Sequence, residues 1–408
     1  MVTLGKRRAS ALATTVVALL ALSACSSNTA SAPAASEAPA SAAPAASSAA
    51  AAAPTMAPAS AAPSAEVVLT DPYSVALAEA AGTTVDTSAF KKTAPYKLAT
   101  ITQGPINGWG TVFDVTLAKA LADTGKVDMN SVLYAAWNGK TENQTKGMDD
   151  AIAAKVDGII LTSLSRAGLS ASVERATAAG IPVVTCMAGV ESPKYTAEVS
   201  RNIPAMGYES AKALVEKLGG KGNVVMLNGI AGVDAAELWK VGAQAAFAEA
   251  PGIKIVSDEY GNWSTADATS VMRTVVAQNP QIDGIWVGGL EMGPGVVSAF
   301  GEAGIDVPFI AGTNPTNGFL KLAQDQSLDF YAAPFPPGAA KTCVDVMMNI
   351  LDGQPVQKFT DVKTLMDGTS PYGTADLAKW YVPTLNDDFI GPLVYDEKTY
   401  ADNGFARK

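Results

Sequence analysis

Residues 156–184 read VDGIILTSLSRAGLSASVERATAAGIPVV, and this stretch decides the fold. Two short apolar runs, Gly158–Leu161 and Val183–Thr185, enclose a segment, Leu169–Ala179, whose apolar residues recur at helical spacing. The apolar runs do not alternate with polar residues, which is typical of parallel strands covered on both faces. A strand, a helix and a second strand in this order predict a βαβ unit.

The same rhythm continues on both sides of this unit. Upstream, the expected strands are Lys97–Thr102 and Ser131–Ala136, and the expected helices are Val112–Asp123 and Gln144–Ala154. Downstream, the strands are Asn223–Leu227, Lys254–Asp258, Gly284–Val287 and Phe309–Ala311, and the helices are Ala235–Ala248, Ala266–Gln278 and Gly295–Ala303. Because the rhythm occurs twice, it predicts an α/β fold of two doubly wound α/β/α lobes rather than one very large sheet.

The N-terminus has the features of an export signal. Lys6-Arg7-Arg8 is followed by Ala9–Leu22, an apolar run that is too short to span a membrane. Leu22-Ser23-Ala24-Cys25 resembles the lipobox of bacterial lipoproteins, which implies cleavage before Cys25 and acylation of that cysteine. We therefore expect a lipoprotein signal peptide over residues 1–24. The alternative is a plain signal peptide that ends near a cysteine without lipidation. Residues 25–65 are almost entirely Ala, Ser and Pro, and they predict a disordered tether.

Composition excludes several classes of function. The chain has no histidine, which removes histidine-based catalysis and imidazole metal sites. It has three cysteines and no C-x-x-C, so a cysteine zinc site is not expected. The net charge of −10 and the pI of about 4.7 argue against a nucleic-acid partner. We expect no cofactor and no metal. We also expect Cys186 and Cys343 to be buried and reduced, with a disulfide between them as the alternative.

In open parallel sheets, ligands bind beyond the carboxyl ends of the strands. The residues that follow the expected strands are therefore site candidates, and several of them are tryptophans. An indole at a lobe edge offers a flat face to a ligand, although burial in the core is the competing interpretation. We interpret Trp286 as a core residue and find no site signal at Trp380. The expected ligand-binding set is Gln103, Asn107, Trp109, Trp137, Asn138, Ser163, Met187, Asn228, Trp239, Trp263, Leu290, Glu291 and Asn314.

From Tyr96 to Lys358 the chain resembles the ribose/galactose-type periplasmic binding proteins, the sugar-binding subunits of ABC importers. The segments that carry this resemblance are Val156–Leu161, Ala178–Val184, Leu218–Val225, Ile282–Trp286, Glu291-Met292 with Gly295, and Ile350–Gly353. The resemblance implies two lobes joined by three crossovers, a ligand enclosed between them, and a return to the first lobe near Ala332–Pro337. It places lobe one at 95–202 plus 333–358, and lobe two at 203–332 plus part of 359–408.

The site departs from the family pattern. The positions where the family often has Asp-Arg are Met187-Ala188, an expected Arg is Trp239, and an expected Asn-Asp is Gly289-Leu290. The aromatic stacking positions are kept as Trp109 and Trp263. We therefore expect an aromatic clamp around a ligand that is flatter or less hydroxylated than ribose, or that is bound in a different orientation.

These observations predict a lipid-anchored, monomeric receptor on the outer face of the cytoplasmic membrane that delivers a sugar or sugar-like molecule to an ABC permease. The alternative is a receptor for an aromatic or nucleoside-like compound that signals to a membrane sensor. A retaining hydrolase would need two carboxylates about 5–5.5 Å apart. Glu291 is the only carboxylate well placed at a strand end, because Asp234 and Glu237 lie on a loop and a helix start. We therefore expect no enzyme.

Overall fold

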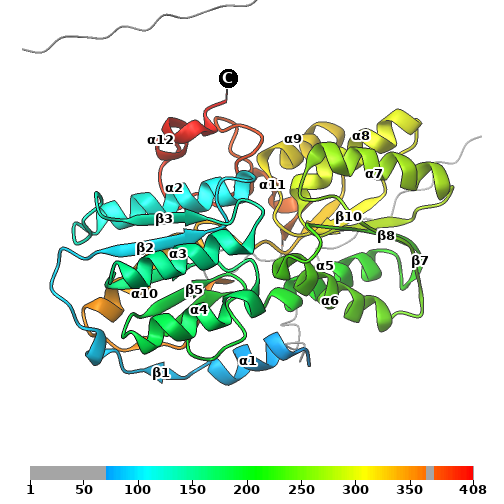
Figure 1. Ribbon diagram of the computed structural model, residues 1–408. Coiled ribbons are helices and arrows are strands. Elements are labelled where there is room, and N and C mark those ends of the chain that lie inside the picture. The colour runs from blue at the N-terminus through cyan, green and yellow to red at the C-terminus, as the bar shows by residue number, and fades with distance from the viewer. Residues whose placement is uncertain (1–69, 364–371, 408) are drawn as a thin grey trace, which may run out of the picture. The chain divides into compact units, whose positions relative to one another are not determined.

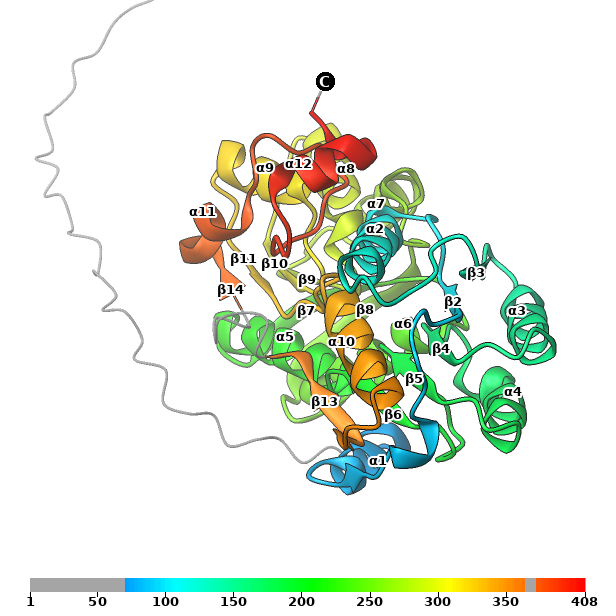
Figure 2. The same ribbon diagram turned by 90° about the vertical axis from the view of Figure 1, so that its left-hand side faces the viewer.

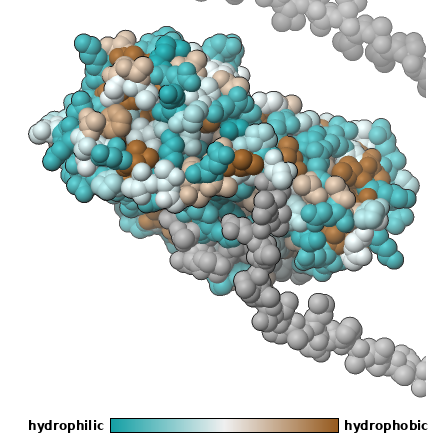
Figure 3. All heavy atoms as spheres, turned by 90° about the horizontal axis from the view of Figure 1, so that it is seen from below, coloured by the Kyte–Doolittle hydropathy of each residue, from teal (hydrophilic) through white to brown (hydrophobic). Residues whose placement is uncertain are grey.

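The computed structural model describes residues 70–363 and 372–407 (Figure 1). The predicted signal peptide, Cys25 and the whole predicted tether over residues 25–65 lie outside the described residues. In the part of the chain that the structure describes, no helix is long and apolar enough to cross a membrane. The face shown in Figure 3 mixes hydrophilic residues with small groups of hydrophobic ones, as is usual for protein surfaces.

The first lobe is built on a parallel sheet with the strand order β13-β6-β5-β4-β2-β3. Its strands are β2 (Leu98–Thr102), β3 (Leu133–Ala136), β4 (Gly158–Leu161), β5 (Val183–Cys186), β6 (Ala197–Ser200) and β13 (Phe359–Asp361). Helices α2 (Gly108–Asp123) and α10 (Ala339–Leu351) cover one face, and α3 (Thr141–Ala153) and α4 (Arg166–Ala178) cover the other (Figure 2).

The second lobe repeats this plan with the strand order β14-β11-β10-β9-β7-β8. Its strands are β7 (Lys221–Asn228), β8 (Gly252–Tyr260), β9 (Gly284–Val287), β10 (Phe309–Gly312), β11 (Phe330–Ala332) and the antiparallel edge strand β14 (Tyr372–Gly373). Helices α5 (Ile203–Lys217) and α6 (Asp234–Ala248) pack together, and α7 (Thr265–Gln278) packs against α8 (Gly293–Ala303), next to α9 (Asn317–Gln326). The two doubly wound lobes are thus as predicted.

Three crossovers join the lobes. The chain passes from β6 to α5, returns from β11 to α10, and passes again from β13 to β14. Arg201 in the first crossover donates a hydrogen bond of 2.6 Å from Nη1 to the Pro334 carbonyl in the second, so these two segments are tied together. The strand β13 extends the first sheet to residue 361, beyond the lobe boundary that the resemblance suggested.

Residues 70–94, which the sequence placed before the first lobe, are folded onto it. Helix α1 (Pro72–Ala80) inserts the Tyr73 hydroxyl beside the first crossover, where it contacts Glu198 Oε1 at 2.9 Å and Ser200 Oγ at 3.0 Å. After β1 (Thr84–Val85), which pairs with β12 (Val356–Gln357), and a 3₁₀ turn (Ser88–Phe90), the chain reaches β2. The expected first lobe began at residue 95, and residues 70–94 pack against it as well.

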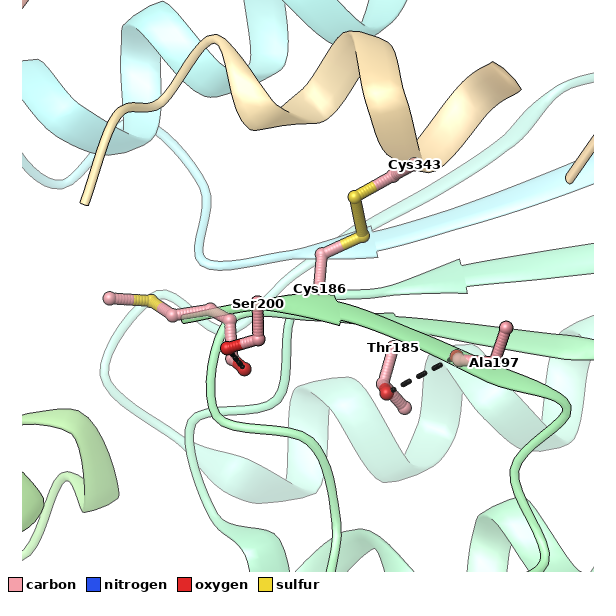
Figure 4. Close-up of a disulfide and its surroundings, with 6 residues drawn as sticks. Thr185, Cys186, Ala197, Ser200 and Cys343 are labelled. Atoms are coloured by element: carbon pink, nitrogen blue, oxygen red, sulfur yellow. Dashed lines mark hydrogen bonds between the residues drawn. A yellow bond between two sulfur atoms is a disulfide. The ribbon is translucent and has the colours of Figure 1, made fainter. Parts of the chain in front are cut away.

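Cys186 and Cys343 form a disulfide, so the expectation that both thiols are reduced is wrong (Figure 4). Cys186 ends β5, and Cys343 lies on α10, which crosses back over the first sheet. Their Cα atoms are 6.5 Å apart, within the range that disulfides span. Their separation of 157 residues hides this proximity from any sequence pattern. An exported protein meets the oxidising conditions in which such bonds persist.

The disulfide gives a first prediction. Replacing Cys343 with Ala removes a cross-link between segments that are far apart in the chain, and should lower the free energy of unfolding by about 2–5 kcal/mol. Thermal melts with and without reductant measure this. Reductant should destabilise the wild-type protein towards the variant and leave the variant unchanged. Equal melting temperatures for both proteins under oxidising conditions would contradict the cross-link.

A second prediction concerns Glu198. Burial raises the pKa of this carboxyl to about 7, although the Tyr73 hydroxyl, Arg166 and Lys358 oppose the shift. Because the unfolded chain titrates near the ordinary value of 4.5, the native state holds more protons between these pH values. Stability should therefore fall as the pH rises through this window. Glu198→Gln should remove roughly 1–3 kcal/mol of that fall. The measurement is urea unfolding of the wild-type protein and of Glu198→Gln between pH 4.5 and 8. Stability–pH curves that run parallel for the two proteins would refute this assignment.

Candidate functional site

Buried polar side-chain atoms without a hydrogen-bond partner gather at the carboxyl ends of strands in both lobes. Thr162 Oγ1 and Ser163 Oγ follow β4 in the first lobe. The second lobe contributes atoms from β7 and from the residues after β9 and β10, namely Asn228 Oδ1, Glu291 Oε2 and Thr313 Oγ1. Two helix residues add Arg166 Nε and Trp239 Nε1, while Asp114 Oδ1 is a similar atom on α2. Because most buried polar groups in native proteins are paired, this gathering marks a place that awaits polar partners.

In the first lobe, a buried glutamine fixes the backbone of the loop after β4. Gln144 Nε2 donates to the carbonyls of Thr102 and Thr162 at 3.0 and 2.8 Å, and its Oε1 accepts from the Leu164 amide. The backbone is thereby satisfied by protein groups, while the Thr162 and Ser163 hydroxyls are left without partners. A hydroxyl both donates and accepts, so these two atoms suit the hydroxyls of a ligand.

In the second lobe, Asn228 is oriented by one end of its amide. Its Nδ2 donates to Asp258 Oδ1 at 2.6 Å and to the Glu259 carbonyl at 2.8 Å, which leaves Oδ1 as a fixed acceptor. Thr313 is held by its backbone, because its amide donates to Val287 and its carbonyl accepts from Leu290. Thr313 directly follows β10, but it is absent from the expected ligand-binding set.

Glu291 presents a buried carboxyl oxygen at the end of β9, within a 3₁₀ turn (Leu290–Met292). Desolvation raises the pKa of this carboxyl to about 8, opposed only by a hydrogen bond from its own backbone. At neutral pH the group is therefore largely a carboxylic acid that can donate a hydrogen bond. Such a neutral group suits an uncharged, hydroxylated ligand better than an anion.

Two tryptophans of the second lobe, Trp239 and Trp263, form a pair beside Glu291. The Trp239 and Trp263 rings meet edge to face at 6.0 Å, and Trp263 Nε1 donates to the Gly288 carbonyl at 2.8 Å. A Cβ at Gly229 would lie only 2.3 Å from the Trp263 ring, so this close approach of ring and backbone requires glycine. Trp239 Nε1 is left without a partner in a fully buried position.

Trp109 is hydrogen-bonded to the second crossover. Its ring stacks on Phe113 at 5.1 Å, and its Nε1 donates to the Phe335 carbonyl in the second crossover at 2.9 Å. The structure thus brings Trp109 and Trp263 into contact with aromatic residues of their surroundings rather than with each other. An aromatic clamp formed by these two rings stays a prediction.

Several other predicted site residues hold the loops in shape. Asn107 caps α2 and accepts from Gly110 N and Gln103 Nε2, both at 3.0 Å. Asn314 Oδ1 accepts from the Phe335 amide at 2.7 Å. The Met187 carbonyl accepts a hydrogen bond from Tyr73. Leu290 and Trp137 are buried, whereas Asn138 is exposed. The side chains of Asn107 and Asn314 are therefore occupied by the protein, which strand-end position alone does not reveal.

Unusual backbone geometry accumulates at the same strand ends. Asn138, Met187, Trp263 and Asn314 all have positive φ, at 45°, 78°, 51° and 45°. Non-glycine residues adopt this region at a cost, and such residues cluster at functional sites. Four members of the expected ligand-binding set therefore share a feature that sequence analysis did not use.

The two lobes also touch beside the site. The Arg166 amide bonds to the Asp234 carboxylate, and the Asp234 amide donates to the Leu164 carbonyl at 3.3 Å. The Arg166 guanidinium lies 4.6 Å from the centre of the Tyr73 ring. Sequence reasoning missed Arg166, although its position three residues after Ser163 was a usable signal.

Two further observations delimit the site. A hollow of about 770 Å³ is lined by residues of α8 and α9, among them Pro294, and by the loops that precede β10 and β11, which contain Ile305 and Leu328. Within residues 70–363 and 372–407, no group of three or more acidic or cysteine side chains could hold a metal ion.

Known proteins are similar to this chain in sequence and in fold. A family model described as a periplasmic binding protein domain matches residues 102–355. The xylitol-binding protein of Mycolicibacterium smegmatis is 28% identical over 294 residues, which cover 70% of this chain and 82% of that protein. The ribose import binding protein of Bacillus subtilis is 24% identical over 246 residues, covering 60% and 80%.

Solved structures agree with this relationship. A solute-binding protein from Actinobacillus succinogenes with bound D-allose is 24% identical with a TM-score of 0.59, over 69% of this chain and 99% of its own. A Mycobacterium smegmatis protein in complex with β-D-fucofuranose is 23% identical with a TM-score of 0.62, over 69% and 92%. These likenesses show the fold. The chain therefore belongs to the type I periplasmic binding proteins, the family of sugar-binding proteins of ABC importers.

Proposed function

We propose that this protein is a lipid-anchored receptor that captures a small polyhydroxylated molecule between its lobes and delivers it to an ABC permease. The observation that carries the proposal is the gathering of unpartnered buried polar atoms at the strand ends of both lobes. Each buried donor or acceptor left unpaired costs about 1–3 kcal/mol. A ligand that pairs with atoms of both lobes would recover this cost and favour closure.

The chemistry of these atoms suits a sugar or a sugar alcohol of about five carbons. Trp239 Nε1 only donates, Asn228 Oδ1 only accepts, and the hydroxyls of Thr162, Ser163 and Thr313 do both. A chain or ring of hydroxyls can pair with such a mixture of donors and acceptors, because each hydroxyl both donates and accepts. The relatives named for xylitol and ribose support this class.

Two earlier alternatives are less well supported. A flat aromatic or nucleoside-like ligand would need open indole faces, whereas Trp109 stacks on Phe113 and Trp263 packs against Trp239. An enzymatic role is not supported either, because the relatives are substrate-binding proteins. Delivery to a permease rather than to a sensor is supported by a relative that is named as an import binding protein.

Ligand identity can be tested by calorimetry with xylitol, ribose, allose, adenosine and benzoate. We expect xylitol or one of the sugars to bind and adenosine and benzoate not to bind. Thr313→Val removes one unpartnered hydroxyl with little change of shape, and should weaken binding at least tenfold, which is about 1.4 kcal/mol. Thr185→Val is the matched control, because that buried hydroxyl faces the Ala197 carbonyl within the first lobe. Binding of adenosine or benzoate alone would overturn the proposed ligand class.

The lipid anchor has its own test. Cys25→Ser removes the only sulfur in the sequence that resembles a lipobox. The protein should therefore leave the membrane fraction or remain unprocessed. Cell fractionation and mass determination of the mature N-terminus measure this. Cys343→Ala is the matched control, since it removes a cysteine outside the signal and should leave membrane attachment intact. A processed Cys25→Ser protein that still pellets with membranes would argue for another anchor.

A further inference from the structure

The C-terminal segment, defined here as residues 377–407, contacts both lobes. It begins with α11 (Leu377–Trp380) and ends with α12 (Glu397–Tyr400) and a π-helical turn (Ala401–Phe405). The segment lies beyond the matched family domain, which ends at residue 355. The relative with bound D-allose is covered over 99% of its chain but covers only 69% of this one, so this chain carries more than the shared fold. Figure 1 shows the segment above α2, next to α9.

One end of the contact is Asn317, the first residue of α9 in the second lobe. Its Nδ2 donates to the carbonyls of Val382 and Leu385 at 2.8 and 3.1 Å, and its Oδ1 accepts from the Val382 amide at 3.1 Å. The backbone adds two bonds, from Asn317 N to the Phe389 carbonyl at 2.8 Å and from Gly318 N to the Asp387 carbonyl at 2.9 Å. Asn317 is only 1% exposed, so these bonds are shielded from water.

The other end lies on α2 in the first lobe. Val112 of α2 packs in one apolar cluster with Phe389, Tyr400 and Phe405. The Tyr400 hydroxyl lies 3.2 Å from Thr116 Oγ1 of α2. At the start of α2, a Cβ on Gly108 would lie 1.9 Å from the Asp388 carbonyl oxygen, so the backbones touch there.

Both anchors meet at a single residue. The Phe389 carbonyl accepts from Asn317 in the second lobe, while the Phe389 ring contacts Tyr400 at 5.1 Å and belongs to the cluster on α2. Because one residue makes both contacts, no residues lie between them that could extend if α2 moved away from α9. Moving the lobes apart there must break one anchor or be resisted by both.

The anchored elements carry predicted ligand residues. Asn107 and Trp109 lie at the start of α2, and Asn314 lies three residues before Asn317. We propose that residues 382–405 form a fourth connection between the lobes that limits their opening, and that Asn317 is the residue that positions it. The inference rests on the proposed function in one respect, namely that the lobes separate to admit a ligand.

The distance between the lobes in ligand-free protein tests this directly. Tyr134 on β3 and Ile255 on β8 are exposed residues of the outermost strands of the two sheets, so spin labels at Tyr134→Cys and Ile255→Cys report opening. In this background Asn317→Ala should shift the distance distribution to longer values and broaden it at least about twofold. Val112→Ala, which loosens the other anchor, should shift it in the same direction.

Asn279→Ala is the matched control. Asn279 caps α7 in the second lobe, and its Nδ2 likewise donates to a backbone carbonyl, that of Val275. It should leave the distribution unchanged even if it lowers the melting temperature. Unchanged distances in both Asn317→Ala and Val112→Ala would overturn the inference, whatever their stability, because the segment would then belong to the lobes without linking them.

Hydrogen exchange of the unmodified protein provides a second, variant-free test. The amides of Asn317 and Gly318, which bond to the segment, should exchange as slowly as amides inside α9. Exchange as fast as that of a frayed terminus would overturn the inference. Neither experiment uses a ligand, so a failure here is distinct from a failure of the proposed sugar binding.

Discussion

The polarity of parallel strands is the constraint on which the rest of this structure depends. Every pair in the first sheet is parallel, and in the second sheet only the short β14 is antiparallel. All carboxyl ends of a parallel sheet lie at one edge, so each lobe has one edge at which loops can gather side chains. The crossovers leave from the ends of strands β6, β11 and β13. The hydrogen bond between Arg166 and Asp234 shows that residues after β4 and β7 meet across the lobes.

At these edges the protein accepts a local cost. Asn228, Ser163 and Thr313 are almost fully buried, yet each keeps a polar atom without a partner. Their surroundings fix the atoms before any ligand arrives, because Gln144 and Asp258 hold the neighbouring groups in place. Such preorganisation removes part of the ordering cost of binding. The raised pKa of Glu291 adds a donor rather than a charge, which keeps the edge electrically neutral near this carboxyl.

Much of the fold could be predicted from local pattern, and its exceptions share one cause. The strands Gly158–Leu161 and Gly284–Val287 were predicted to the residue, because apolar runs between helices identify buried parallel strands. Helix α1 and the Cys186–Cys343 disulfide were not, because each depends on a partner far away in the sequence. The candidate site divides in the same way. Strand-end position indicated Ser163, Asn228 and Glu291, but could not show that Asn107 and Asn314 bond within the protein.

The segments outside the matched domain both act where the lobes are joined. The Tyr73 hydroxyl of α1 donates to the Arg201 carbonyl in the first crossover, and Phe389 contacts elements of both lobes. A restraint on opening changes binding even when it touches no ligand, because the apparent affinity scales with the population of the competent state. A chain that favours closure binds more tightly once the ligand is inside, but admits it through a rarer open state. We therefore propose that the added segments affect how fast ligand is exchanged, whereas the strand ends determine which ligand is held.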